Sequence, residues 1–217
     1  MELKGKKILF IGDSITEPGA GTMYWQMLEQ RTGAICCADG RSGSCIARQQ
    51  RPEEMDFNLN IRKHFISRID EWDADADVVV VFGGVNDFGH GDAPIGSMND
   101  RTGDTFYGAL HELYASLLER YPKGRIVVMT PMHFTGEDSW IRFDGKRRMG
   151  LLVDYVRVIR QVAEYYAIPV LDVYANSGIQ PNVPAICKRF TIDGLHPNEL
   201  GHARIADCLE RFLKLYI

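Results

Sequence analysis

A serine near the start of the chain stands where it could attack an ester carbonyl. Residues 12–16 read Gly-Asp-Ser-Ile-Thr and follow the apolar run 8–11, which has the pattern of a strand. A hydroxyl just beyond a strand projects from the end of a sheet, and Gly12 lets the chain turn sharply there. Ser14 is therefore a candidate nucleophile. The alternative is a polar turn in which the serine caps a helix.

A serine hydroxyl is a weak nucleophile and needs a neighbouring base. His196 is the best placed of the six histidines, because it lies in Asp-Gly-Leu-His-Pro, a loop just before the terminal helical pattern. Pro197 disfavours helical geometry at His196 and suits a helix start. Asp193 can fold back across a turn to orient the imidazole and stabilise its charged form, as in serine triads. The same Asp-x-x-His could instead be a helix-capping turn.

Acyl transfer also requires hydrogen-bond donors for the oxyanion that develops on the substrate. Residues 83–87, Gly-Gly-Val-Asn-Asp, follow the apolar run 78–82, and Asn86 offers a side-chain amide. Residues 39–43, Asp-Gly-Arg-Ser-Gly, follow another predicted strand and offer a glycine N–H. Both segments also have the composition of ordinary turns, so each is a weak signal alone.

The elements that must position these residues alternate along the chain. Short apolar runs predict five strands, and apolar residues at helical spacing predict the helices between them. This alternation favours an α/β fold with a parallel sheet and helices on both faces, in which ligands bind at the carboxyl ends of the strands. Residues 174–190 are expected to form a loop. The predicted strands are residues 8–11, 35–38, 78–82, 126–129 and 170–173, and the helical patterns are 24–32, 61–69, 110–121, 152–163 and 205–216.

Four short motifs, taken in order, resemble those of the SGNH hydrolases, also called the GDSL esterase/lipase family. They are Gly-Asp-Ser at 12–14, the glycine Gly40, Gly-x-Asn-Asp at 84–87 and Asp-x-x-His at 193–196. The resemblance extends from about residue 7 to residue 215. It implies a three-layer sandwich with a five-stranded parallel sheet in flavodoxin-like order.

The resemblance also implies a role for each matched residue. Ser14 would be the nucleophile, His196 the general base and Asp193 the carboxylate that orients it. The oxyanion hole would comprise the N–H groups of Ser14 and Gly40 and the side chain of Asn86. Gly43 is an alternative to Gly40. We prefer Gly40 because it lies nearer the strand end, and because Gly-Arg-Ser at residues 40–42 resembles a motif of carbohydrate acetylesterases in the family.

These roles imply a serine esterase that hydrolyses small carboxylic esters through an acyl-enzyme. Aromatic and polar residues in the segments 88–102 and 132–149 favour an acetylesterase acting on a carbohydrate or a similar polar substrate. The alternatives are a lipase- or thioesterase-type acylhydrolase of the same family, a metal-dependent hydrolase and a flavodoxin-like phosphate-binding module. The metal-dependent reading would use Asp13, Asp87, Asp193 and His196 as ligands. The residues predicted to contact the substrate are Asp13, Asp87, His133 and Trp140.

Composition limits the remaining classes of function. The 217 residues suit a single domain spanning 1–217, and a net charge of −4 argues against a broad nucleic-acid surface. The five cysteines lack the spacing of a zinc site or a disulfide framework. The N-terminus lacks the pattern of a signal peptide, and the longest strongly apolar run is too short to cross a bilayer. We therefore expect a cytoplasmic protein with a small-molecule ester as ligand, no cofactor, no metal and no membrane or nucleic-acid partner. The sequence leaves a homo-oligomer open.

Overall fold

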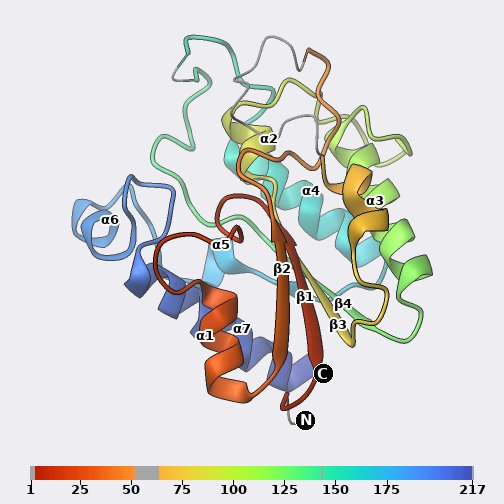
Figure 1. The fold of residues 1–217 in the computed structure, drawn as a ribbon. Coiled ribbons are helices and arrows are strands. Elements are labelled where there is room, and N and C mark those ends of the chain that lie inside the picture. Colours follow the sequence, from red (N-terminus) through yellow and green to blue (C-terminus); the bar gives the residue numbers. More distant parts are fainter. Residues whose placement is uncertain (1–2, 52–63, 143, 217) are drawn as a thin grey trace.

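The computed structural model describes residues 3–51, 64–142 and 144–216 and contains a five-stranded parallel sheet. The strand order is β2-β1-β3-β4-β5, which confirms the predicted flavodoxin-like arrangement (Figure 1). Figure 1 shows α2 (Val85–Gly89) and several long loops beyond the carboxyl ends of the strands. The strands are β1 (Lys7–Gly12), β2 (Ile35–Gly40), β3 (Val78–Phe82), β4 (Arg125–Met129) and β5 (Val170–Leu171).

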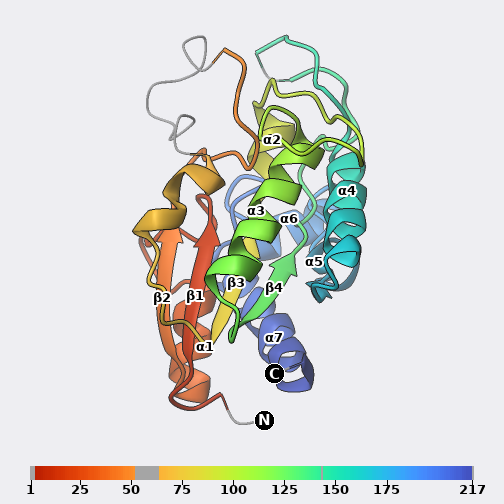
Figure 2. The same cartoon turned by 90° about the vertical axis from the view of Figure 1, so that its right-hand side faces the viewer.

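Helices cover both faces of the sheet because successive strand side chains point to opposite faces. Helices α1 (Tyr24–Thr32) and α7 (Glu199–Tyr216) cover one face, and α3 (Phe106–Arg120) and α4 (Leu152–Tyr165) cover the other (Figure 2). All five residues of β3 are buried, as expected for a central strand with both faces covered. Alternate residues of β1 and β3 belong to separate apolar clusters: Leu9, Ile11, Val79 and Val81 to one, and Ile8, Phe10, Val78 and Val80 to the other.

Two predicted elements differ in the structure. The helical pattern 61–69 becomes the 3₁₀ helix η2 (Phe65–Glu71), and residues 61–63 lie outside the described residues. The strand predicted for residues 170–173 ends at Leu171. Asp172 accepts a hydrogen bond from the Ala175 N–H (3.0 Å) and starts the short helix α5 (Val173–Asn176). A side-chain cap of this kind overrides β-branched propensity over a few residues.

Two further short helices lie where loops are expected. They are α2 and α6 (Pro184–Phe190), of five and seven residues. Helix α6 begins at a proline, which suits the first helical position. Elements this short contain too few turns to show an apolar period in the sequence. No helix among the described residues combines the length and apolar character needed to cross a bilayer.

Candidate active site

Ser14 lies at the tip of a tight turn just beyond β1. The Asp13 carboxylate accepts the Ile15 N–H (3.0 Å), and the Asp13 carbonyl accepts the N–H groups of Thr16 (3.0 Å) and Glu17 (2.9 Å). Gly12 is required because a Cβ there would lie 2.1 Å from the Thr16 hydroxyl oxygen. The turn leaves Ser14 half-buried, with its side chain accessible.

His196 and Asp193 complete a chain of hydrogen bonds that begins at Ser14. The Ser14 Oγ is 3.0 Å from His196 Nε2, and His196 Nδ1 is 2.7 Å from Asp193 Oδ2. The second carboxylate oxygen of Asp193 accepts the N–H groups of Leu195 (2.9 Å) and His196 (2.7 Å). Burial raises the pKa of Asp193, but these hydrogen bonds outweigh it and leave the pKa below its ordinary value. Asp193 is therefore an ionised acceptor, which leaves Nε2 free to accept the Ser14 proton.

The loop that carries His196 is held by the segment after β4. The Thr135 N–H donates to the Gly194 carbonyl (3.1 Å), and a Cβ at Gly194 would lie 2.2 Å from the Thr135 hydroxyl oxygen. Gly194 also has a φ of +87°, which glycine adopts readily. The capping of α7 belongs to a different residue, Asn198, whose side-chain oxygen accepts the Gly201 N–H (3.1 Å). The Asp-x-x-His segment is thus separate from the helix cap.

Three groups near the strand ends can donate hydrogen bonds to a substrate. Asn86 is 7% exposed and donates one amide hydrogen to the Ser44 carbonyl (3.1 Å), which leaves its second hydrogen available. The other two groups are the backbone N–H groups of Ser14 and Gly43, neither of which has an acceptor among the described residues. Gly43 has a φ of +73° and is buried.

Gly40 occupies the last position of β2, and its N–H group does not point towards β1. The Arg41 N–H donates to the Gly12 carbonyl (3.2 Å), so the N–H of the preceding residue, Gly40, points away from β1 towards the open edge of the sheet. A Cβ at Gly40 would lie 2.0 Å from the Glu17 nitrogen. The absent side chain therefore allows β2 to pack against the turn that follows Ser14.

Asp13 and Asp87, both predicted to contact substrate, are buried and bonded to the backbone. They are 1% and 3% exposed, and burial is the main cause that raises their pKa values to about 6 and about 7. Asp87 accepts the N–H groups of Ile46 (2.8 Å) and Ala47 (2.9 Å). These contacts shape the loops around the site.

His133 and Trp140, the other predicted substrate contacts, lie in the segment after β4. His133 Nδ1 is 2.8 Å from the Glu137 carboxylate, and its ring lies 3.8 Å from the ring of Tyr174. Trp140 is 45% exposed, and the guanidinium of Arg147 lies 5.4 Å from its ring centre.

Two cavities lie beside the Ser14–His196 pair, and neither is lined by His133 or Trp140. The larger, about 540 Å³, contains Asn86 and Asp193, and the smaller, about 450 Å³, contains Ser14 and His196. His90, Phe134 and Arg142 of the larger cavity lie in the segments 88–102 and 132–149, as do Gly89, Thr135 and Asp144. The sequence gives no reason to single out Val85 or Leu195, although each lies inside one of the matched motifs.

His202 also lines the smaller cavity, although its position within a helical pattern gave no reason to single it out. It is 6% exposed, and its ring stacks on Tyr24 at 6.2 Å. Burial, with a smaller contribution from His196, lowers its pKa to about 4. His202 is therefore neutral near pH 7.

The predicted metal-ligand set does not come together. Among residues 3–51, 64–142 and 144–216, no three His, Cys, Asp or Glu side chains are grouped closely enough to hold a metal ion. The side chains of Asp13 and Asp87 are occupied by backbone N–H groups, and Asp193 is occupied by His196.

Comparisons with known proteins identify the family. None of the curated proteins matches the chain. A solved structure from Lactobacillus plantarum is 30% identical, with a TM-score of 0.81 and 99% of each chain covered. The acetyl xylan esterase AlAXEase is 21% identical (TM-score 0.63, 95% of this chain and 99% of that one), and a lipase/acylhydrolase from Enterococcus faecalis is 19% identical (TM-score 0.64, 96% and 95%). Residues 10–204 match the GDSL-like Lipase/Acylhydrolase family. The chain therefore belongs to this family and is an ester hydrolase.

Proposed function

We propose that the protein is a serine esterase that cleaves small carboxylic esters through an acyl-enzyme on Ser14. The observation that carries the proposal is the continuous chain from Ser14 Oγ to His196 Nε2 (3.0 Å) and from His196 Nδ1 to Asp193 (2.7 Å). A non-catalytic phosphate-binding module would not require Ser14 to contact His196, since an anion-binding loop at residues 12–16 needs no histidine.

The chemistry follows from the direction of these hydrogen bonds. His196 Nε2 takes the proton from the Ser14 hydroxyl as its oxygen attacks the ester carbonyl, and Asp193 stabilises the imidazolium that forms. The imidazolium then gives its proton to the leaving alcohol. In the second half of the reaction, His196 activates a water molecule that attacks the acyl-enzyme, releases the acid and restores Ser14.

We assign the oxyanion hole to the N–H groups of Ser14 and Gly43 and the side-chain amide of Asn86. Both N–H groups lack an intramolecular acceptor within the described residues, whereas the Gly40 N–H points towards the open edge of the sheet. This assignment replaces the preference for Gly40 that the sequence suggests. Gly40 acts instead by letting β2 approach the Ser14 turn closely.

The larger cavity favours a short, partly polar substrate. Val85, Phe134 and Leu195 supply apolar contacts, and His90 and Arg142 supply polar ones. A volume of about 540 Å³ suits one sugar-sized group with a small acyl chain. The similarity to an acetyl xylan esterase supports acetylated carbohydrates as the first substrates to test.

The test combines labelling and kinetics. A fluorophosphonate should modify the peptide that contains Ser14, as detected by mass spectrometry, and Ser14→Ala should abolish both labelling and ester hydrolysis. Ser42 lines the smaller cavity together with Ser14, so Ser42→Ala is the matched control and should retain labelling. Wild-type activity in the Ser14→Ala variant would refute the proposal. Rates on acetyl to decanoyl 4-nitrophenyl esters then separate an acetylesterase from a lipase-type enzyme.

A further inference from the structure

A buried arginine contacts segments that carry the proposed oxyanion donors. Arg68, on η2, is only 1% exposed. Placing a guanidinium in the interior costs free energy unless its hydrogen bonds are satisfied by well-placed partners. The positions of those partners therefore indicate what the residue does.

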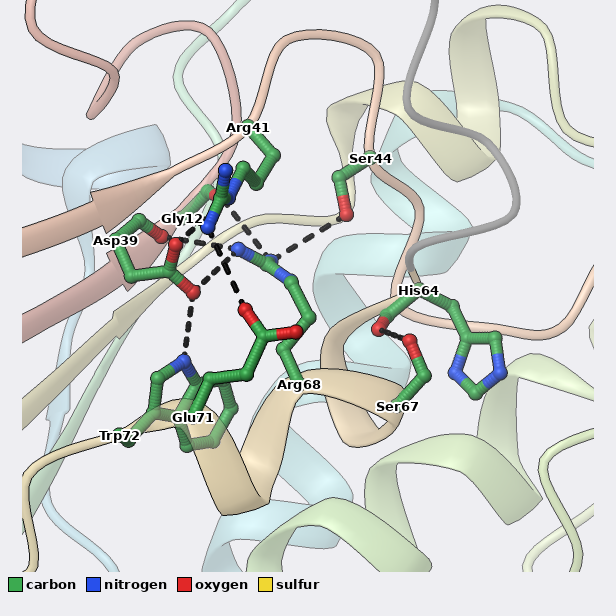
Figure 3. Close-up of polar contacts among 9 residues, drawn as sticks. All are labelled: Gly12, Asp39, Arg41, Ser44, His64, Ser67, Arg68, Glu71 and Trp72. Atoms are coloured by element: carbon green, nitrogen blue, oxygen red, sulfur yellow. Dashed lines mark hydrogen bonds and ion pairs between the residues drawn. The ribbon is translucent and has the colours of Figure 1, made fainter.

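The Arg68 guanidinium joins three separate segments at the carboxyl ends of the strands (Figure 3). Its Nη1 donates to the Asp39 carboxylate (2.7 Å) and the Asp39 carbonyl (3.1 Å), at the end of β2. Its Nη2 donates to the Gly12 carbonyl (3.3 Å), at the end of β1, and to the Ser44 hydroxyl (3.4 Å), in the loop after β2.

The position of the guanidinium is fixed from the other side as well. The indole N–H of Trp72 donates to Asp39 (2.6 Å), and Nε of Arg41 donates to its second carboxylate oxygen (2.8 Å). The ring of Phe65 lies 5.0 Å from the guanidinium carbon. Figure 3 shows Asp39 between Trp72 and the two arginines. The pair therefore forms part of a packed network and differs from a mobile surface salt bridge.

Two of the segments that Arg68 holds lead directly to an oxyanion donor. Gly12 lies two residues before Ser14, and Ser44 directly follows Gly43. The Ser44 carbonyl also accepts the hydrogen bond that orients the Asn86 amide (3.1 Å). We propose that Arg68 is a positioning residue that sets the relative placement of the three donors. This inference rests on the proposed function.

The guanidinium suits this role because it is planar and presents donors to several acceptors at once. A lysine ammonium is a point charge on a flexible stem and cannot reproduce the fork. Because Asp39 balances the charge of Arg68, we expect the effect on catalysis to come from geometry. Misplacement of a catalytic group by about 1 Å can cost about 10²-fold in rate.

A double-mutant cycle on kcat tests the proposal. Arg68→Met should lower kcat for 4-nitrophenyl acetate by about 10- to 100-fold, with KM changed less than about threefold. Arg68→Lys should fall between Arg68→Met and wild type. One of the three donors is already absent in an Asn86→Ala background, so Arg68→Met should cost clearly less there than in the wild-type background, because coupled residues are non-additive. Full additivity, or unchanged kcat in Arg68→Met, would overturn the proposal.

Two further variants separate positioning from stability. Arg68→Met leaves the half-buried Asp39 carboxylate without the buried guanidinium, although Trp72 and Arg41 still donate to it. Arg68→Met/Asp39→Asn removes both charges of the pair and should recover the melting temperature without recovering kcat. Recovery of kcat together with stability would show a merely structural role. Arg31→Met removes an arginine–aspartate pair between α1 and α7 and should leave kcat unchanged. Unchanged kcat in Asn86→Ala alone would refute the proposed oxyanion hole, a result distinct from failure of the Arg68 proposal.

Discussion

Replacing the carboxylate of Asp193 by an amide should damage catalysis more than removing the side chain. One oxygen, Oδ1, accepts the N–H groups of both Leu195 and His196, at 2.9 Å and 2.7 Å. An amide at this position keeps its oxygen on those two donors, so Asp193→Asn places an NH₂ group 2.7 Å from His196 Nδ1. Nδ1 must then accept, and the ring proton moves to Nε2.

This tautomer disables the base. Nε2 lies 3.0 Å from Ser14 Oγ, and once it carries a proton it cannot accept the one from the serine. Trapping the wrong tautomer in a serine triad costs about 10⁴-fold in kcat, or roughly 5.5 kcal/mol of transition-state stabilisation. In Asp193→Ala, water can reach Nδ1–H, since the side chains of His196 and Asp193 are 39% and 51% exposed. The productive tautomer then persists, and we expect a loss of about 10²-fold.

The assay is kcat for 4-nitrophenyl acetate at saturating substrate, with melting temperatures measured for both variants to confirm folding. The expected order is wild type, then Asp193→Ala, then Asp193→Asn. An Asp193→Asn variant that stays within tenfold of wild type, or that is faster than Asp193→Ala, would refute this prediction.

Three further predictions follow from the described contacts. Asn86→Ala should lower kcat by about 10²–10³-fold, with little change in KM, and a loss confined to KM would contradict an oxyanion role. Gly40→Ala should destabilise the fold by about 3 kcal/mol in urea unfolding, because its Cβ would lie 2.0 Å from the Glu17 nitrogen, and wild-type stability would show that Gly40 is not tightly packed. The pKa of His202 is lowered from 6.5 to about 4 in the folded protein. Between these two pH values the unfolded chain takes up a proton that the folded state excludes, so the free energy of unfolding should fall by about 3 kcal/mol as the pH drops from 6.5 to 4. The free energy of unfolding of His202→Phe should fall less over that pH range than that of the wild type. An equal fall in the two proteins would mean that other groups cause the acid sensitivity.

Much of the fold could be predicted from local patterns. The runs at β1, β3 and β4 and the stripes at α3 and α4 come within a few residues of their observed bounds, and α7 begins six residues before its stripe. The predictions are wrong for short elements, which only a few residues indicate in the sequence. Val173 has strand propensity, yet the Asp172 cap draws it into α5. Residues 65–71 keep apolar spacing but tighten into η2.

For the candidate site, too, the sequence predicts some features and leaves others undecided. The sequence identified Ser14, His196, Asp193 and Asn86 as candidates, and the structure places Ser14, His196 and Asp193 in hydrogen-bonding contact. The sequence alone could not decide between Gly40 and Gly43 as the backbone donor, because the direction of a backbone N–H depends on strand pairing. The substrate contacts of His133 and Trp140 stay predictions, since loop conformation decides which aromatic residues reach a bound substrate.

Residue types and their periodicity are local properties, so the chemistry available to this protein and the order of its elements follow from the amino-acid sequence. The orientation of distant groups toward one another depends on how the chain packs in three dimensions. Arg68 shows this best, because its role depends on Gly12, Asp39 and Ser44 meeting at one point. That meeting is set by strand register and by the packing of η2 against the sheet, neither of which is encoded in any short stretch of residues.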